Sequence, residues 1–92
     1  MLKIKLFGNK HCGSCKKWKP LFERLMQEYN IEYVYIDIEK DEEERLKNNV
    51  TAIPVTVFYN DNEEMGRILG SMEEDTARKQ IEYYVRQGET QG

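Results

Sequence analysis

Apolar and polar residues alternate at the start of the chain and then recur at helical spacing. Over residues 2–7 apolar side chains alternate with lysines before Gly8 and Asn9, which predicts a β-strand followed by a loop. From Cys12 onward the apolar residues lie three or four positions apart, which predicts one face of a helix that ends at Asn30. The apolar stripe comprises Trp18, Leu21, Phe22, Leu25, Met26 and Tyr29.

The middle of the chain predicts a second strand and a short helix. Residues 31–38 are rich in β-branched and aromatic side chains, a composition typical of strands. The run Asp-Glu-Glu-Glu that begins at Asp41 predicts a capping box, in which Asp41 accepts a hydrogen bond from the first turn and Glu44 reaches back. We expect the helix to end within two turns, near Asn48.

The last third of the chain predicts a hairpin and a final helix. Residues 55–59 and 64–69 predict two antiparallel strands that an Asn-Asp-Asn turn joins. A second capping box at residues 71–74 predicts the start of the last helix, and Gly88 is expected to end it.

This order of elements predicts an α/β fold. The opening strand–helix–strand unit should be parallel and right-handed, and the hairpin completes a four-stranded mixed sheet flanked by three helices. We expect the first and last helices on one face and the short middle helix on the other, where Lys3 and Lys5 reach water. These elements make one domain over residues 1–88, with a frayed tail at residues 89–92.

Composition and charge exclude several classes of function. The 92 residues include 14 Lys and Arg against 17 Asp and Glu, and the net charge of -3 gives no basic surface for nucleic acid. No run of roughly 18 or more apolar residues is present to span a bilayer. The first residues lack the apolar run of a signal peptide. We therefore expect a cytoplasmic protein, in a reducing compartment, with no membrane partner.

Cys12 and Cys15 carry the clearest chemical signal. In a reducing compartment their C-x-x-C spacing favours catalysis or metal binding over a structural disulfide. They follow a strand and a loop and begin a helix, where free backbone N–H groups and the helix dipole favour a thiolate. We expect Cys12 to be the exposed nucleophile and the more buried Cys15 to resolve the mixed disulfide.

The predicted active-site loop includes four more residues: His11, Gly13, Ser14 and Lys16. We expect Gly13 to let the backbone turn tightly. His11 and Lys16 place titratable or positive charge near the thiols. We expect Trp18, in the helix that follows, to be partly buried.

A metal site is the main alternative interpretation of the cysteine pair. The pair supplies half of a tetrahedral zinc site, which needs four ligands. Only His11 stands nearby as a further obvious ligand, so a closed site within one chain would need carboxylates. We expect no metal in the redox interpretation, and an inert pair is the remaining alternative.

Two motifs and a glycine resemble the thioredoxin/glutaredoxin superfamily. Residues 11–20, His-Cys-Gly-Ser-Cys-Lys-Lys-Trp-Lys-Pro, are similar to the thioredoxin active-site run with its later helix proline. Residues 51–55, Thr-Ala-Ile-Pro-Val, are similar to the cis-proline motif, and Gly70 stands at the position of the groove glycine. The resemblance covers residues 2–87 and implies a thioredoxin-like fold.

The resemblance also implies roles for three residues of a substrate groove. Ile53 and Pro54 should be joined by a cis peptide bond packed against the Cys12–Cys15 pair. The backbone of Ile53 should hydrogen-bond an extended substrate segment, and Gly70 should let the substrate backbone approach.

Four positions depart from the thioredoxin pattern. His11 replaces the tryptophan before the first cysteine, and Ser14 replaces the proline between the cysteines. The buried aspartate of the family is replaced by Leu6, and its lysine partner on the second strand is replaced by Tyr35. Proton transfer is therefore expected to come from water, His11 or Tyr35, and Tyr35 is expected to pack in the core.

The implied activity is reduction of protein disulfides through the C-G-S-C dithiol, with no bound cofactor. The electrons would come from an NADPH-linked thioredoxin reductase or from glutathione, since the chain is glutaredoxin-sized. Residues 70–75 are weakly similar to the acidic helix start that binds glutathione in glutaredoxins. We expect a monomer. A metal-binding module and a non-catalytic binding module of the same fold remain alternatives.

Overall fold

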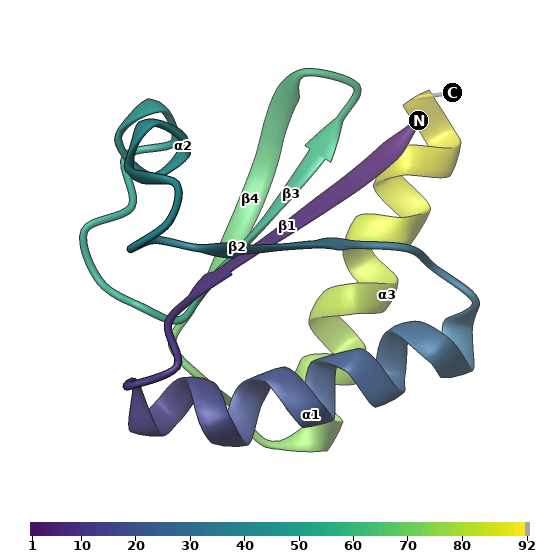
Figure 1. Ribbon diagram of the computed structural model, residues 1–92. Helices are drawn as coiled ribbons and strands as arrows, with labels where there is room; N and C mark the ends of the chain where they lie inside the picture. Colours follow the sequence, from purple (N-terminus) through teal and green to yellow (C-terminus); the bar gives the residue numbers. More distant parts are fainter. Residues whose placement is uncertain (92) are drawn as a thin grey trace.

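The computed structural model describes the backbone of residues 1–91 and the side chains of residues 1–88. The helices and strands follow the predicted order (Figure 1). Their bounds are β1 (Leu2–Gly8), α1 (Gly13–Tyr29), β2 (Val34–Asp37), α2 (Glu42–Lys47), β3 (Val55–Asn60), β4 (Glu63–Leu69) and α3 (Glu74–Gln91).

The strands form the mixed four-stranded sheet that the sequence predicts, in the order β2-β1-β3-β4. Strand β1 pairs with β2 in parallel and with β3 antiparallel, and β3 pairs with β4 antiparallel. The register places Leu6 of β1 beside Tyr35 of β2 and beside Thr56 of β3. The carboxyl ends of β1 and β2 therefore lie at the same edge of the sheet, next to the start of α1.

Strand β2 is shorter than the predicted range of 31–38 because the first residues of that range follow directly on the C-terminal cap of α1. Asn30 adopts the left-handed conformation with φ 58° and caps the helix. The N–H of Ile31 then donates to the carbonyl of Met26 across 2.8 Å, closing the cap. The chain is free to pair with β1 only from Val34 onward.

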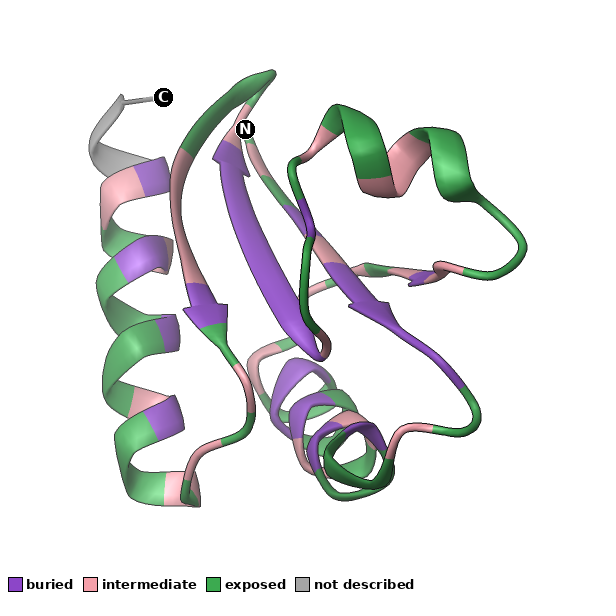
Figure 2. Ribbon diagram, turned by 90° about the vertical axis from the view of Figure 1, so that its left-hand side faces the viewer, coloured by how far each residue is buried: buried purple, intermediate pink, exposed green. Residues whose placement is uncertain are grey.

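Helices α1 and α3 cover one face of the sheet and α2 lies on the other, as expected (Figure 2). The larger core lies between the sheet and the two long helices. Its fully buried side chains include Leu6, Trp18, Phe22, Leu25, Phe58 and Ile81. The smaller core beneath α2 comprises Phe7, Ile36, Val50, Val55, Val57 and Tyr59. None of the described helices combines the length and apolar composition that crossing a bilayer requires.

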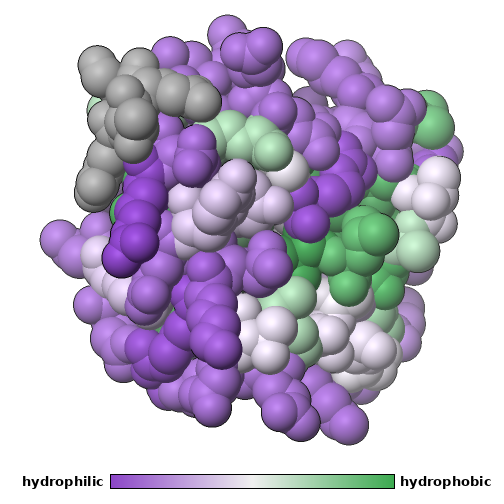
Figure 3. Space-filling model, turned by 180° about the vertical axis from the view of Figure 1, so that it is seen from behind, coloured by the Kyte–Doolittle hydropathy of each residue, from purple (hydrophilic) through white to green (hydrophobic). Residues whose placement is uncertain are grey.

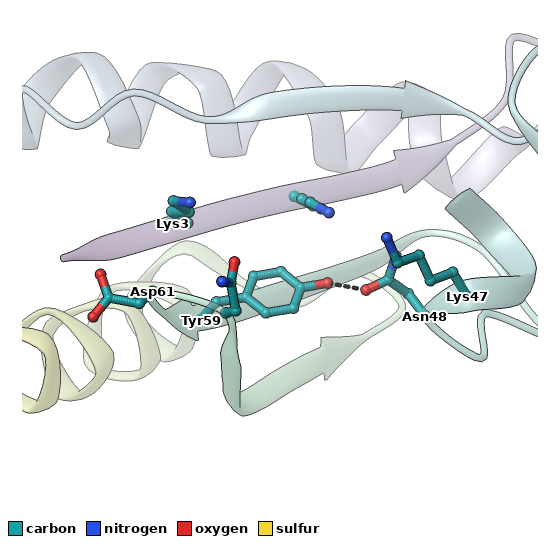
Figure 4. A pocket seen from close by; sticks show the side chains of 7 residues that line it. Lys3, Lys47, Asn48, Tyr59 and Asp61 are labelled. Carbon is teal, nitrogen blue, oxygen red and sulfur yellow. Dashed lines mark hydrogen bonds between the residues drawn. The ribbon is translucent and has the colours of Figure 1, made fainter. Parts of the chain in front are cut away.

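Lysines from β1 line a hollow of about 250 Å³ on the α2 face (Figure 4). Lys3 and Lys5 lie on this face, as predicted, and line the hollow together with Tyr59 and Asn48, where the hydroxyl of Tyr59 donates to Asn48. The capping box is only half formed: Asp41 accepts from the N–H of Glu44, but the Glu44 carboxylate binds the Lys5 ammonium instead of reaching back. A cation is the stronger partner for a carboxylate than a neutral N–H.

The last helix differs from the prediction at both ends. It begins at Glu74, not in a capping box at Ser71, and the Glu74 carboxylate binds Arg24 of α1 and Arg78 of α3. The expected end at Gly88 is wrong, because α3 continues to Gln91. Gly88 packs on β1, where a Cβ would lie 3.3 Å from that of Leu2. Helix α3 thus includes residues 89–91 of the expected tail, and Gly92 lies outside the described residues.

Candidate active site at the start of helix α1

The two cysteines form a disulfide at the start of α1, with their Cα atoms 5.2 Å apart. Cys12 is the N-cap residue, with extended backbone angles of φ -89° and ψ 118°, and Cys15 lies within the first turn. Cys12 is half-buried and Cys15 is 3% exposed. The structure therefore leaves Cys12 as the accessible sulfur, as expected for a nucleophile.

The backbone around Cys12 favours negative charge on its sulfur. The N–H of Cys15 donates to the Sγ of Cys12 across 3.1 Å. No acidic residue stands in the first turn of α1, so no carboxylate opposes the positive end of the helix dipole. A helix N-terminus with free N–H groups stabilises a thiolate, which is the reactive form of cysteine.

Asn9 shapes the loop that leads into the helix, a role not predicted from the sequence. Its side chain is buried, and its Oδ1 accepts from the N–H of His11 across 2.7 Å. Its carbonyl accepts from the N–H of Cys12 across 3.2 Å. Asparagine in a short loop is a known signal for this kind of side-chain-to-backbone turn.

The four other loop residues of the sequence prediction are exposed around the disulfide: His11, Gly13, Ser14 and Lys16. The reason given for Gly13 is wrong. Among the described glycines only Gly70 has positive φ, and a Cβ on Gly13 would meet no atom within 4 Å. Gly13 begins an ordinary helical turn that other residues can also form.

The loop before β3 brings the predicted groove residues to the disulfide. The Ile53–Pro54 peptide bond is cis, as predicted, and Pro54 is fully buried. The carbonyl oxygen of Ile53 lies 3.8 Å from the Sγ of Cys12. Gly70 follows β4 with φ 77°, and its N–H donates to the carbonyl of Pro54 across 2.8 Å. Three segments distant in sequence thus meet at the accessible sulfur.

The surface beside this meeting point is partly apolar. Leu69 is 71% exposed, next to Gly70. A hollow of about 340 Å³ runs between the first turns of α1 and the segment after β4, lined by Lys17, Trp18, Leu21, Ser71, Met72 and Glu73. Seen from behind, apolar surface gathers in one area of an otherwise polar face (Figure 3).

A buried polar pair lies beneath the site. Trp18 and Thr56 are both fully buried, and the indole Nε1 donates to the hydroxyl oxygen of Thr56 across 2.8 Å. From its sequence position Trp18 is expected to be only partly buried, and nothing in the sequence points to Thr56. The pair ties α1 to β3 close to both Cys15 and Pro54.

Two of the departures from the family pattern come together on the sheet. Leu6 is fully buried where the family carries an aspartate. Tyr35, its neighbour on β2, is half-buried at the edge of the core, and its hydroxyl and the sulfur of Cys15 both border the space beside Gly8. Burial, with a smaller effect of the Asp37 charge, raises the pKa of Tyr35 above its ordinary value.

Glu74, the first residue of α3, is occupied by ion pairs. Hydrogen bonds from Arg24 and then Arg78 hold the pKa of Glu74 below its ordinary value. Its carboxylate is therefore committed to two cations of the chain itself. Within the part of the chain that the structure describes, no group of three or more His, Cys, Asp or Glu is placed to hold a metal ion.

Comparison with known proteins gives one consistent result. The family model for thioredoxin matches residues 4–83. The chain is 30% identical over 79 residues to NADPH-dependent thioredoxin reductase 3 of Arabidopsis thaliana, covering 84% of this chain and 15% of that protein. It is 32% identical over 69 residues to thioredoxin H5 of Oryza sativa, covering 74% of this chain and 51% of that protein.

A solved structure agrees with these sequence matches. The X-ray structure of Fasciola hepatica thioredoxin has a TM-score of 0.82 at 32% identity, covering 90% of this chain and 80% of that one. The chain thus spans about half the length of the rice thioredoxin and a small part of the plant reductase.

Proposed function

The chain belongs to the thioredoxin family, and on that premise we propose that it is a thiol–disulfide oxidoreductase that reduces protein disulfides. The observation that carries the proposal is the Cys12–Cys15 disulfide at the N-terminus of α1, beside the cis Ile53–Pro54 bond. In this arrangement one sulfur is accessible and stabilised as a thiolate, and the second is within reach to resolve the intermediate.

The proposed reaction has two exchange steps. The Cys12 thiolate attacks one sulfur of a substrate disulfide; a Cys12–substrate bond forms, the substrate S–S bond breaks, and the departing thiolate takes a proton from water. Cys15 then loses its proton and attacks the Sγ of Cys12. The Cys12–Cys15 bond forms, the second substrate thiolate leaves, and two electrons have passed to the substrate.

The substrate segment is proposed to lie across Ile53, Pro54 and Gly70. The Ile53 carbonyl stands beside the Cys12 sulfur, so a segment that pairs with this loop would present its disulfide to the nucleophile. Gly70 leaves open space at its Cβ position, which allows a backbone to approach. The exposed Leu69 favours an apolar side chain in the substrate.

The electron donor is proposed to be an NADPH-linked thioredoxin reductase. Family membership supports this choice, and so does the state of Glu74. A glutathione site at the start of α3 would need an acidic group free for an amino group, and Glu74, the first residue of the helix, is bound by Arg24 and Arg78 instead. We propose further that the protein works as a monomer in the cytoplasm, without a bound cofactor.

The proposal is tested by reduction of insulin with two electron supplies in parallel: NADPH with thioredoxin reductase, and glutathione with glutathione reductase. We expect insulin reduction with the first supply, its loss in Cys12→Ser, and full activity in Thr76→Ser, a matched control at an exposed position of α3. Activity with glutathione alone would reverse the donor assignment. No reduction with either supply or with dithiothreitol would contradict the proposed function, and stoichiometric zinc in the purified protein would favour the metal alternative.

A further inference from the structure

The hydroxyl of Tyr35 and the sulfur of Cys15 face the same small space beside Gly8. A Cβ on Gly8 would lie 3.0 Å from the Tyr35 hydroxyl oxygen and 3.3 Å from the Cys15 Sγ. A side chain larger than hydrogen at this position would therefore crowd both groups. Because Gly8 has none, the hydroxyl and the sulfur border the same open space at the end of β1.

The Tyr35 hydroxyl has no partner among the hydrogen bonds of the described residues, unlike those of three other tyrosines. Tyr29 donates to Glu82, Tyr33 donates to Glu23, and Tyr59 donates to Asn48. A partly buried hydroxyl without a protein partner is available to any acceptor that forms nearby. In the disulfide state the Cys15 sulfur is neutral, but after reduction it can become a thiolate, which is a strong acceptor.

We propose that Tyr35 is a positioning residue that donates a hydrogen bond to the Cys15 thiolate and so promotes the resolving step. This inference rests on the proposed function, because the step exists only if Cys15 attacks a mixed disulfide. During that step the Cys15 proton leaves to solvent, the Cys12–Cys15 bond forms, and the substrate thiolate departs and takes up a proton. Tyr35 keeps its own proton throughout and changes only the stability of the Cys15 thiolate.

The surroundings of Tyr35 keep its hydroxyl a donor. Raised above its ordinary value by burial and by Asp37, the pKa of Tyr35 leaves it protonated in the range where a thiol titrates. The charged groups that face it are Asp37, two residues along the same face of β2, and Lys19 of α1, whose ammonium lies 4.7 Å from the ring centroid. Strand β1 contributes Leu6 and Gly8, which carry no charge.

A hydroxyl beside the resolving cysteine has the opposite effect on the pKa of that cysteine from a carboxylate in the same place. A carboxylate accepts a proton and repels a thiolate, so it raises the pKa of its neighbour. A neutral hydroxyl donates to the thiolate and lowers that pKa. With Leu6 in place of the family's aspartate, this chain lacks a carboxylate at that position. Tyr35 offers a hydroxyl donor instead.

The test is a pH titration of the reduced protein labelled with ¹³C at the cysteine β-carbons, followed by NMR. Tyr35→Phe keeps the ring and its contact with Lys19 and removes only the hydroxyl. We expect the titration midpoint of Cys15 to rise by roughly one pH unit, a tenfold loss of thiolate at a given pH. Tyr33→Phe is the matched control, because the Tyr33 hydroxyl donates to Glu23, and its Cys15 midpoint should equal that of the unmodified protein.

A Cys15 midpoint that stays unchanged or falls in Tyr35→Phe would overturn the inference. The titration uses no substrate and no electron donor, so its outcome is independent of the insulin assay. A protein inactive toward insulin but showing the Tyr35-dependent shift would contradict the proposed function alone. An active protein without the shift would contradict the role of Tyr35 alone.

Discussion

The backbone N–H of Cys15 lies 3.1 Å from the sulfur of Cys12 and donates to it. In the proposed mechanism, the residue that resolves the intermediate therefore also stabilises the nucleophile before the reaction begins. The two cysteines consequently have unequal environments: Cys12 is accessible at the N-cap, and Cys15 is buried one turn further along. This asymmetry supports the two chemical roles proposed for the cysteines.

Replacing Cys12 and replacing Cys15 should therefore have different effects on trapping of the mixed disulfide. Cys15→Ser keeps the accessible nucleophile and removes the group that releases substrate, so a stable mixed disulfide should accumulate at Cys12. Cys12→Ser should trap little, because its remaining sulfur is buried. Non-reducing electrophoresis and intact mass after incubation with a disulfide-containing protein measure both. Trapping by Cys12→Ser and none by Cys15→Ser would reverse the assignment.

Gly70 and Gly13 should respond in opposite ways to alanine. Gly70 has φ 77°, where a Cβ is strained, so Gly70→Ala should lower the free energy of unfolding by about 1–2 kcal/mol. Gly13 begins α1 without positive φ and with open space around it, so Gly13→Ala should change that free energy by less than about 0.5 kcal/mol. Urea unfolding of the oxidised proteins gives both values, and equal stabilities for the two variants would refute the argument.

The buried pair of Trp18 and Thr56 should contribute measurably to stability. Thr56→Val keeps the shape of the side chain and leaves the indole N–H of Trp18 buried without a partner. We expect a loss of about 1–3 kcal/mol in the free energy of unfolding. Thr51→Val, at an exposed position of the neighbouring loop, is the control and should change it by less than about 0.5 kcal/mol. If Thr56→Val unfolds at the same urea concentration as the unmodified protein, the hydrogen bond contributes nothing.

The ion pairs between α1 and α3 should make stability depend on acid pH. A hydrogen bond from Arg78 holds the pKa of Glu28 below its ordinary value, and bonds from Arg24 and Arg78 do the same for Glu74. A carboxylate with a lowered folded pKa stabilises the fold above its ordinary pKa of about 4.5. This contribution is lost as the pH falls through the lowered folded value.

Arg78→Met should therefore be less stable than the unmodified protein at pH 7, and the difference should shrink as both glutamates protonate at acid pH. Lys79→Met removes a neighbouring charge that makes no ion pair among the described residues and should show a smaller difference at pH 7. Urea unfolding at both pH values measures this. A stability difference for Arg78→Met that is the same at neutral and acid pH would assign its role to packing alone.

The sequence predicts the element order because each element has its own periodicity and the two long helices have clear apolar stripes. It also predicts where the two cysteines lie and which one is the more buried, since both depend on position relative to a strand end and a helix start. The cis bond before Pro54 followed from the family resemblance and not from the residues themselves.

The remaining features depend on contacts between segments that the sequence does not place together. Glu44 has the spacing of a capping box, but its carboxylate binds the ammonium group of Lys5 on β1 instead of a backbone N–H. Gly88 is a residue type that commonly ends helices, but here it packs on Leu2 of β1 and the helix continues past it. Tyr35 is an aromatic strand residue, which predicts a place in the core. Only the parallel pairing of β1 and β2 brings its hydroxyl to the space beside Gly8 that the Cys15 sulfur also borders.

The most direct test of the account is the redox equilibrium of Cys12 and Cys15. The protein is equilibrated in thiol–disulfide buffers of graded potential, and its free thiols are then alkylated and counted by intact mass. We predict one reversible two-electron transition with a midpoint of about −270 mV, the value typical of thioredoxin. Two cysteines that remain reduced at every buffer potential, or that oxidise without returning, would contradict the claim that this pair is a redox couple.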